Sequence, residues 1–149
     1  MTITTNHIAL TTMAADHVCF GVDSMEAMID WYGRVLGFTV EKRWTVAELP
    51  GRELAYIIGA SGFRIELISG GTGPRSPSGD SFAEHLGVRG SNHLCFRVPD
   101  VDAAVAAVET AGVTPFFPPT DYPVGAERRI AFLKDIEGNV IEFAGPLKG

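Results

Sequence analysis

The chain has 149 residues, with 18 acidic side chains against 12 lysines and arginines and a formal net charge of −6. This length suits a single domain with its own core, and the acidic balance argues against nucleic-acid binding, which depends on Lys and Arg contacts to phosphates. We expect small-molecule partners, with no nucleic acid and no membrane. Residues 1–14 have neither a basic start nor a long apolar run, so they predict a flexible leader, including His7, and a cytoplasmic protein.

The first half of the domain, about 15–70, predicts a strand, a helix and three further strands. HVCFGV has the composition of a strand, and SMEAMIDWYGRVLG places apolar residues at helical spacing before Gly37. FTVEKRW, ELAYIIG and FRIELIS predict the next strands, separated by Pro-Gly and Ser-Gly turns. Trp31 and Tyr32 on the helix are expected in the core or at an interface.

A connecting loop, about 71–90, leads to a second set of the same elements, about 91–146. SGGTGPRSPSGD predicts a linker or a lid, and FAEHLGV predicts a short helix. HLCFRV then predicts a strand, followed by a helix with Asp100 as its N-cap and Gly112 as its C-cap. TPFF, RRIAFLK and NVIEFAG predict the last three strands.

The two halves repeat each other at an offset of 76 residues. DHVCFGV returns as NHLCFRV, and Glu66 falls on Glu142. The same 49 residues separate His17 from Glu66 and His93 from Glu142. The period is too long and the copies too few for a solenoid, so the sequence predicts one α+β domain, about 15–146, built from two fused βαβββ modules.

Strand alternation places the repeated polar side chains on one face. His17 and Cys19 face away from the helix, and Glu66, between two apolar residues, faces the same way. His93 and Glu142 occupy the matching positions of the second module. A lone histidine on a strand is usually structural, but two His and two Glu in matched register suit a divalent transition metal, such as Ni, Zn, Co, Mn or Fe. The metal also supplies the counter-charge that two buried carboxylates need.

Other side chains on this face are two thiols and two guanidinium groups. Cys19 and Cys95 could bridge, but a cytoplasmic compartment is reducing, so we expect reduced structural thiols. Arg64 and Arg97 stand where the other module has no charge. They are candidates to hold a carboxylate, phosphate or thioester tail of the substrate, with extension into solvent as the alternative.

These motifs resemble the vicinal oxygen chelate superfamily, which includes glyoxalase I, methylmalonyl-CoA epimerase, extradiol dioxygenases and the fosfomycin and bleomycin resistance proteins. The likeness covers about 16–146, in DHVCFGVD, WYGRVLGF, FRIELI, NHLCFRVPDVDAAV and IAFLKDIEGNVIEF. It implies two tandem modules forming a curled, barrel-like mixed sheet around a metal held by His17, Glu66, His93 and Glu142. KDIEGN departs from the aspartate-proline pair of many relatives, at a turn without a ligand.

The number of ligand positions that this sequence retains narrows the range of activities implied by the resemblance. Four intact positions resemble glyoxalase I or the epimerases, because extradiol dioxygenases and fosfomycin-type enzymes use three and bleomycin binders lack the set. The expected function is a metal-dependent lyase or isomerase of the glyoxalase I type, which deprotonates a carbon next to a metal-bound carbonyl through an enediolate-like intermediate. The alternatives are epimerase-like racemisation of an acyl thioester, favoured by the long run between Glu66 and His93, extradiol-type dioxygenation, and non-catalytic binding of a small molecule.

A glutamate is the expected base, because a carboxylate displaced from a metal in a dry cavity becomes more basic. By resemblance to glyoxalase I, Glu142 is the first choice and Glu66 its pseudo-symmetric partner. Glu48 and Glu53 are outside candidates, expected to be surface charges. We expect a homodimer, since each open half-barrel offers a strand edge and an apolar face, and the site can be completed by one chain or by two.

Overall fold

The computed structural model describes residues 13–123, 125 and 127–149, so the predicted leader lies almost entirely outside the described residues. The expected order of elements is confirmed in both modules. The elements are β1 (His17–Val22), α1 (Met25–Leu36), β2 (Thr39–Trp44), β3 (Leu54–Ile58), β4 (Arg64–Ser69), α2 (Phe82–Gly87), β5 (Leu94–Arg97), α3 (Val101–Thr110), β6 (Phe117–Asp121), β7 (Arg129–Lys134) and β8 (Val140–Gly145).

The two modules have the same sheet topology. Their strand orders are β1-β4-β3-β2 and β5-β8-β7-β6. In the first sheet β1 runs parallel to β4, in the second β5 runs parallel to β8, and all other neighbouring strands are antiparallel. The repeat in the sequence is therefore a repeat in the fold. The expected strand at TPFF lies slightly later, at Phe117–Asp121. Its two prolines lack backbone donors and are tolerated because β6 is an edge strand.

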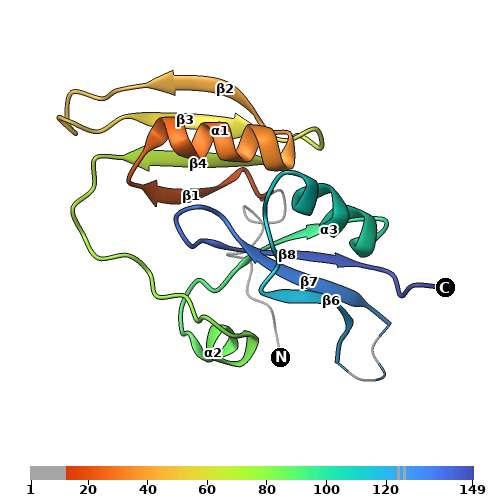
Figure 1. Ribbon diagram of the computed structural model, residues 1–149. Helices are drawn as coiled ribbons and strands as arrows, with labels where there is room; N and C mark the ends of the chain where they lie inside the picture. The colour runs from red at the N-terminus through yellow and green to blue at the C-terminus, as the bar shows by residue number, and fades with distance from the viewer. Residues whose placement is uncertain (1–12, 124, 126) are drawn as a thin grey trace, which may run out of the picture.

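The sheets differ from the expected single curled sheet in one respect. Within the described residues, no strand of the first sheet pairs with a strand of the second. The modules instead meet through α1 and α3, which lie beside each other (Figure 1). The architecture is thus two four-stranded sheets joined through their helices.

One hydrophobic core runs through both modules. Met28, Trp31 and Tyr32 of α1 are almost fully buried, and Val101 and Val108 of α3 belong to the same cluster. The inward residues of the central strands complete this core: Ala55, Ile57, Ile65, Leu67, Ala131, Leu133, Ile141 and Phe143. The core position of Trp31 and Tyr32 is confirmed.

The helix ends follow the expected capping chemistry. Ser24 and Asp100 cap α1 and α3 by accepting hydrogen bonds from backbone amides three residues on. Gly37 ends α1 at φ 72°, which suits glycine. The C-cap of α3 is Ala111 rather than the expected Gly112, which follows it at φ 85°.

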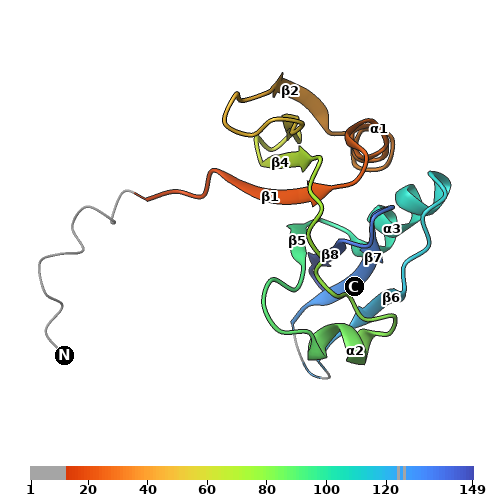
Figure 2. The same ribbon diagram turned by 90° about the vertical axis from the view of Figure 1, so that its left-hand side faces the viewer.

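The outer faces of the two sheets are not equivalent. In the second module α3 covers one face and the short helix α2 lies on the other, whereas in the described part of the chain the first sheet carries a helix on one face only (Figure 2). Phe82 of α2 stacks on Phe117 with ring centroids 4.0 Å apart and contacts Phe132 of β7. The predicted helix in FAEHLGV is confirmed, and Ser81 with Glu84 forms a capping box at its start.

No helix in the described part of the chain is both long enough and apolar enough to cross a membrane.

Candidate metal site

The first candidate pair joins adjacent strands of the first sheet. β1 runs parallel to β4 with Cys19 opposite Glu66, which places Glu66 diagonally across from His17 at the start of β1. The distance from His17 Nε2 to Glu66 Oε2 is 3.2 Å, and the side chains are 31% and 14% exposed. Both therefore lie on the face away from α1, as strand alternation predicts.

The second pair repeats this geometry in the second sheet. Cys95 lies opposite Glu142, and His93 precedes β5 by one residue. His93 Nε2 is 3.1 Å from Glu142 Oε2, with side chains 27% and 12% exposed. The two halves of the predicted ligand set thus have the same internal arrangement.

The structure brings the four predicted ligands together as two pairs, not as one cluster. Among residues 13–123, 125 and 127–149, no group of three or more His, Cys, Asp or Glu side chains is arranged to hold a metal ion. Each pair still fits half of such a site, since an imidazole nitrogen and a carboxylate oxygen face each other at 3.1–3.2 Å. Two lone pairs in that arrangement need a proton or a cation between them.

The surroundings of the two pairs are different. Tyr56 lies beside His17, with ring centroids 5.4 Å apart, and Trp44 lies beside Tyr56, with ring centroids 4.8 Å apart. In the second module the ring of His85, from α2, lies beside His93, with its Nε2 3.2 Å from His93 Nδ1. Within the described residues the first face is therefore an open aromatic surface, whereas the second is partly covered by α2, which leaves the side chain of His93 27% exposed.

Hydrogen bonds also perturb the ionisation of His17 and of the thiols. The hydrogen bond from His17 to Asp16 raises the pKa of His17, and the charge of Glu66 adds to this effect. Burial, together with the nearby carboxylates, raises the pKa of Cys19 to about 11 and that of Cys95 to about 12. Both cysteines are free, and both are protonated at neutral pH.

The two guanidinium groups proposed for substrate binding differ in their contacts and exposure. Arg64 makes a bidentate ion pair with Glu41, with contacts of 2.5 and 2.8 Å, so a substrate anion would have to compete with Glu41. Arg97 is exposed at the end of β5. Its role stays a prediction.

The outside candidates for the base lie in and beside the loop between β2 and β3. Glu48 is exposed there. Glu53 lies 2.6 Å from Arg43 in an ion pair. The structure pairs neither with a candidate ligand.

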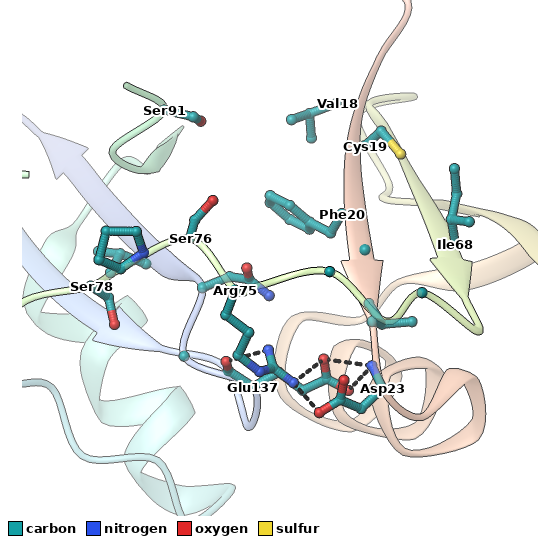
Figure 3. A pocket seen from close by; sticks show the side chains of 18 of the residues that line it. Val18, Cys19, Phe20, Asp23, Ile68, Arg75, Ser76, Ser78, Ser91 and Glu137 are labelled. Atoms are coloured by element: carbon teal, nitrogen blue, oxygen red, sulfur yellow. Dashed lines mark hydrogen bonds and ion pairs between the residues drawn. The ribbon is translucent and has the colours of Figure 1, made fainter. Parts of the chain in front are cut away.

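A cleft of about 450 Å³ lies between the modules beneath the connecting loop, and it reaches His93 and Cys19. Figure 3 shows Arg75 of this loop between Asp23 and Glu137. The other three predicted ligands do not line the cleft. Ion pairs of Arg75 with Asp23 of the first module and Glu137 of the second lie among its lining residues.

Sequence reasoning missed three side chains beside the predicted ligands. Asp16 and Asn92 precede the two histidines and contact their Nδ1 atoms, and both stand at the same repeat position, so the repeat could have revealed them. His85 has no counterpart in the first module. Only the position of α2 reveals its contact with His93.

Comparisons with known proteins identify the family to which this fold belongs. The family model of the Glyoxalase/Bleomycin resistance protein/Dioxygenase superfamily matches residues 14–143. The chain belongs to this superfamily. The resemblance inferred from the repeated motifs is thereby confirmed, together with the two-module fold.

The curated relatives of this superfamily member are partial matches. It is 35% identical over 105 residues to a 4-hydroxyphenylpyruvate dioxygenase-like protein of Mus musculus, and 34% identical over 105 residues to the protein of that name in Rattus norvegicus. The alignment covers 70% of this chain and only 26% of each relative.

Solved structures share the fold at low identity. A glyoxalase family protein from Bacillus cereus is 23% identical, with a TM-score of 0.68 over 90% of this chain and 94% of that one. Glyoxalase I from Zea mays is 18% identical, with a TM-score of 0.67 over 89% of this chain and 44% of the other. The fosfomycin resistance protein FosX from Listeria monocytogenes, complexed with Mn(II) and sulfate, is 14% identical, with a TM-score of 0.60 over 90% and 93%.

Proposed function

We propose that this protein is a metal-dependent lyase or isomerase of the glyoxalase I type, acting on a carbon next to a carbonyl. The observation that carries the proposal is the pair of equivalent His–Glu contacts, 3.2 Å in the first module and 3.1 Å in the second. A purely structural repeat would need to preserve only apolar residues. The preserved contacts join the residue types that bind divalent transition metals.

His17, Glu66, His93 and Glu142 would hold the metal, a divalent ion of the Ni, Zn, Co, Mn or Fe group. When bound, such an ion stabilises negative charge that develops on a carbonyl oxygen and so makes the neighbouring C–H bond more acidic. A cytoplasmic location and a small-molecule substrate with an anionic or thioester portion are part of the same proposal.

Side chains of the protein itself would carry out the proton transfer. Glu142 would accept the proton, because its carboxylate is only 12% exposed and lies between His93 and the hydrogen-bonded thiol of Cys95. Glu66 has the equivalent two neighbours in the first module, His17 and Cys19. A reaction that removes and returns protons on opposite faces of the substrate carbon would use both glutamates.

The two pairs would form one site across a homodimer. Within one chain they lie on separate sheets, and the first pair faces an open surface that includes Trp44 and Tyr56. The first-module face of one copy would close over the second-module face of its partner. A two-fold axis would then create two equivalent sites of two His and two Glu.

The test uses metal analysis and solvent exchange on the full chain. Glu142→Gln should keep bound metal, because an amide oxygen can still coordinate, but should lose at least about 100-fold in the exchange of substrate hydrogen in D₂O. Hemithioacetals and acyl-CoA thioesters are the substrates to offer. Glu66→Gln is the matched control, milder for a glyoxalase-like reaction and equally severe for an epimerase-like one.

A result in which both variants exchange hydrogen as fast as the wild type would remove both glutamates from the role of base. Glu48 and Glu53 would then be the next residues to substitute. A protein that only sequesters its ligand would bind it equally well in both variants and would show no exchange at all.

A dioxygenase is the second candidate, favoured by the name of the curated relatives that match over 105 residues. Such a reaction consumes O₂, whereas proton transfer does not. An oxygen electrode with iron-loaded protein distinguishes the two proposals, because O₂ uptake that depends on substrate would favour the dioxygenase.

A further inference from the structure

Each candidate histidine ligand is preceded in the chain by a residue whose side-chain oxygen contacts the ring nitrogen that faces away from the glutamate. Asp16 Oδ2 lies 2.7 Å from His17 Nδ1, and Asn92 Oδ1 lies 2.8 Å from His93 Nδ1. The two contacts stand at the same repeat position, yet one uses a carboxylate and the other an amide. The shared property is an oxygen at hydrogen-bond distance from Nδ1.

That oxygen is a hydrogen-bond acceptor in both modules. An ionised carboxylate such as that of Asp16 can only accept. The amide of Asn92 is oriented by its nitrogen, which donates to the carbonyl oxygens of His85 and Val88 at 2.8 and 3.2 Å, at the end of α2. A flipped amide would place its oxygen against these two carbonyls, so Oδ1 must face His93.

His85 is a second neighbour of His93 Nδ1. The residue is 1% exposed, and its Nε2 lies 3.2 Å from His93 Nδ1. If His93 carries its proton on Nδ1, the Nε2 of His85 is an acceptor and the proton of His85 is on Nδ1, which is buried without a hydrogen-bond partner in the described part of the chain. That arrangement costs free energy, so the case for a proton on His93 Nδ1 rests on Asn92, whose oxygen is the closer contact at 2.8 Å.

We propose that Asp16 and Asn92 are positioning residues that keep His17 and His93 protonated on Nδ1, so that each ring directs the lone pair of Nε2 toward its glutamate. α2 takes part by orienting Asn92 through the carbonyl oxygens of His85 and Val88. The inference rests on the proposed metal site, because only a nitrogen with a free lone pair can bind a metal ion. Such partners of metal-binding histidines typically contribute about 10–100-fold to metal affinity.

The repeat supplies matched variants for the test. Asp16→Leu and Asn92→Leu remove the acceptor, whereas Asp16→Asn places in the first module the residue that the second module uses. Zinc binding to the full chain, measured by titration calorimetry, should weaken about 10–100-fold in each leucine variant and stay within about threefold of the wild type in Asp16→Asn. Asp16→Leu is the cleaner loss variant, because Asp16 does not anchor α2.

Nitrogen-15 spectra of the imidazole rings in metal-free protein give a second reading, which a purely structural role would not change. In the wild type His17 and His93 should carry a proton on Nδ1, and in the leucine variants the neutral rings should carry it on Nε2, which lies beside a glutamate. Unprotonated Nδ1 atoms in the wild type, or unchanged zinc affinity in Asp16→Leu, would overturn the proposal. Protonated Nδ1 atoms in a wild type whose ring signals do not respond to zinc would support the positioning role and overturn the metal site instead.

Discussion

Each candidate glutamate has a cysteine thiol as its strand neighbour. Cys19 lies opposite Glu66 and Cys95 opposite Glu142, and each thiol is hydrogen bonded to its glutamate. Burial and the carboxylate charge both disfavour the thiolate, which raises the pKa values to about 11 and about 12. At neutral pH the thiols are therefore hydrogen-bond donors to the glutamates and weak nucleophiles.

This predicts slow alkylation of both cysteines in the folded protein. Their pKa values lie above the ordinary thiol value of about 8.5, so at about pH 8 the thiolate fraction is much smaller than in the unfolded chain. Iodoacetamide should react at least about tenfold more slowly with the native protein than with the urea-unfolded protein, and the native rate should keep rising toward pH 11. Mass spectrometry measures this rate, and a plateau near pH 9 would contradict the expected pKa values.

The turn between β7 and β8 connects the two modules through Glu137. Its carboxylate is 7% exposed and accepts hydrogen bonds from the backbone amides of Asp23 and Ser24 at 2.9–3.0 Å, at the start of α1. Arg75 of the connecting loop also donates to it at 3.0 Å (Figure 3). A carboxylate at a helix N-terminus is favourable, and here it comes from the other module.

Removing this carboxylate should therefore destabilise the fold. Glu137→Ala leaves two backbone amides without their acceptor and removes one of the partners of Arg75, so we expect a loss of about 2–4 kcal/mol in the free energy of unfolding. Urea denaturation followed by circular dichroism measures the loss. Glu109→Ala, at an exposed position of α3, is the control and should change stability by less than about 0.5 kcal/mol; equal stability of the two variants would show that the connection is unimportant.

At the level of helices and strands, the sequence predicts the elements better than the contacts between them. The offset of 76 residues predicts both modules and their order of elements, and strand alternation, a local property, predicts that His17 and Glu66 share a face. Ser24 and Asp23, whose amides donate to Glu137, lie 113 and 114 residues away from it in the chain, and no local pattern encodes these contacts. The cover of α2 over the second sheet could not be predicted either, because FAEHLGV has no counterpart in the first module.

Over the whole molecule, the packing of the modules determines where a complete site can form. Because α1 and α3 share one core, the faces that carry the two His–Glu pairs belong to separate sheets. Strand periodicity places all four ligands on equivalent faces but contains no information on how those faces are oriented relative to each other. The repeat is therefore compatible with a site in one chain or across two, and the separate sheets favour two chains.

The most direct test of the central claim combines two variants that each lack one histidine. In a homodimer with shared sites, His17→Ala alone and His93→Ala alone damage both sites. When the two variants are mixed, unfolded and refolded together, about half of the dimers contain one chain of each kind. In such a dimer one site carries both substitutions and the other site carries none.

Zinc bound per chain, measured by atomic emission after gel filtration, should therefore be low for each variant alone. The refolded mixture should recover about a quarter of the wild-type value, because about half of the dimers have one intact site out of two. Sedimentation should find the wild type as a dimer. A mixture that binds no more zinc than either variant alone would contradict a metal site shared between two chains.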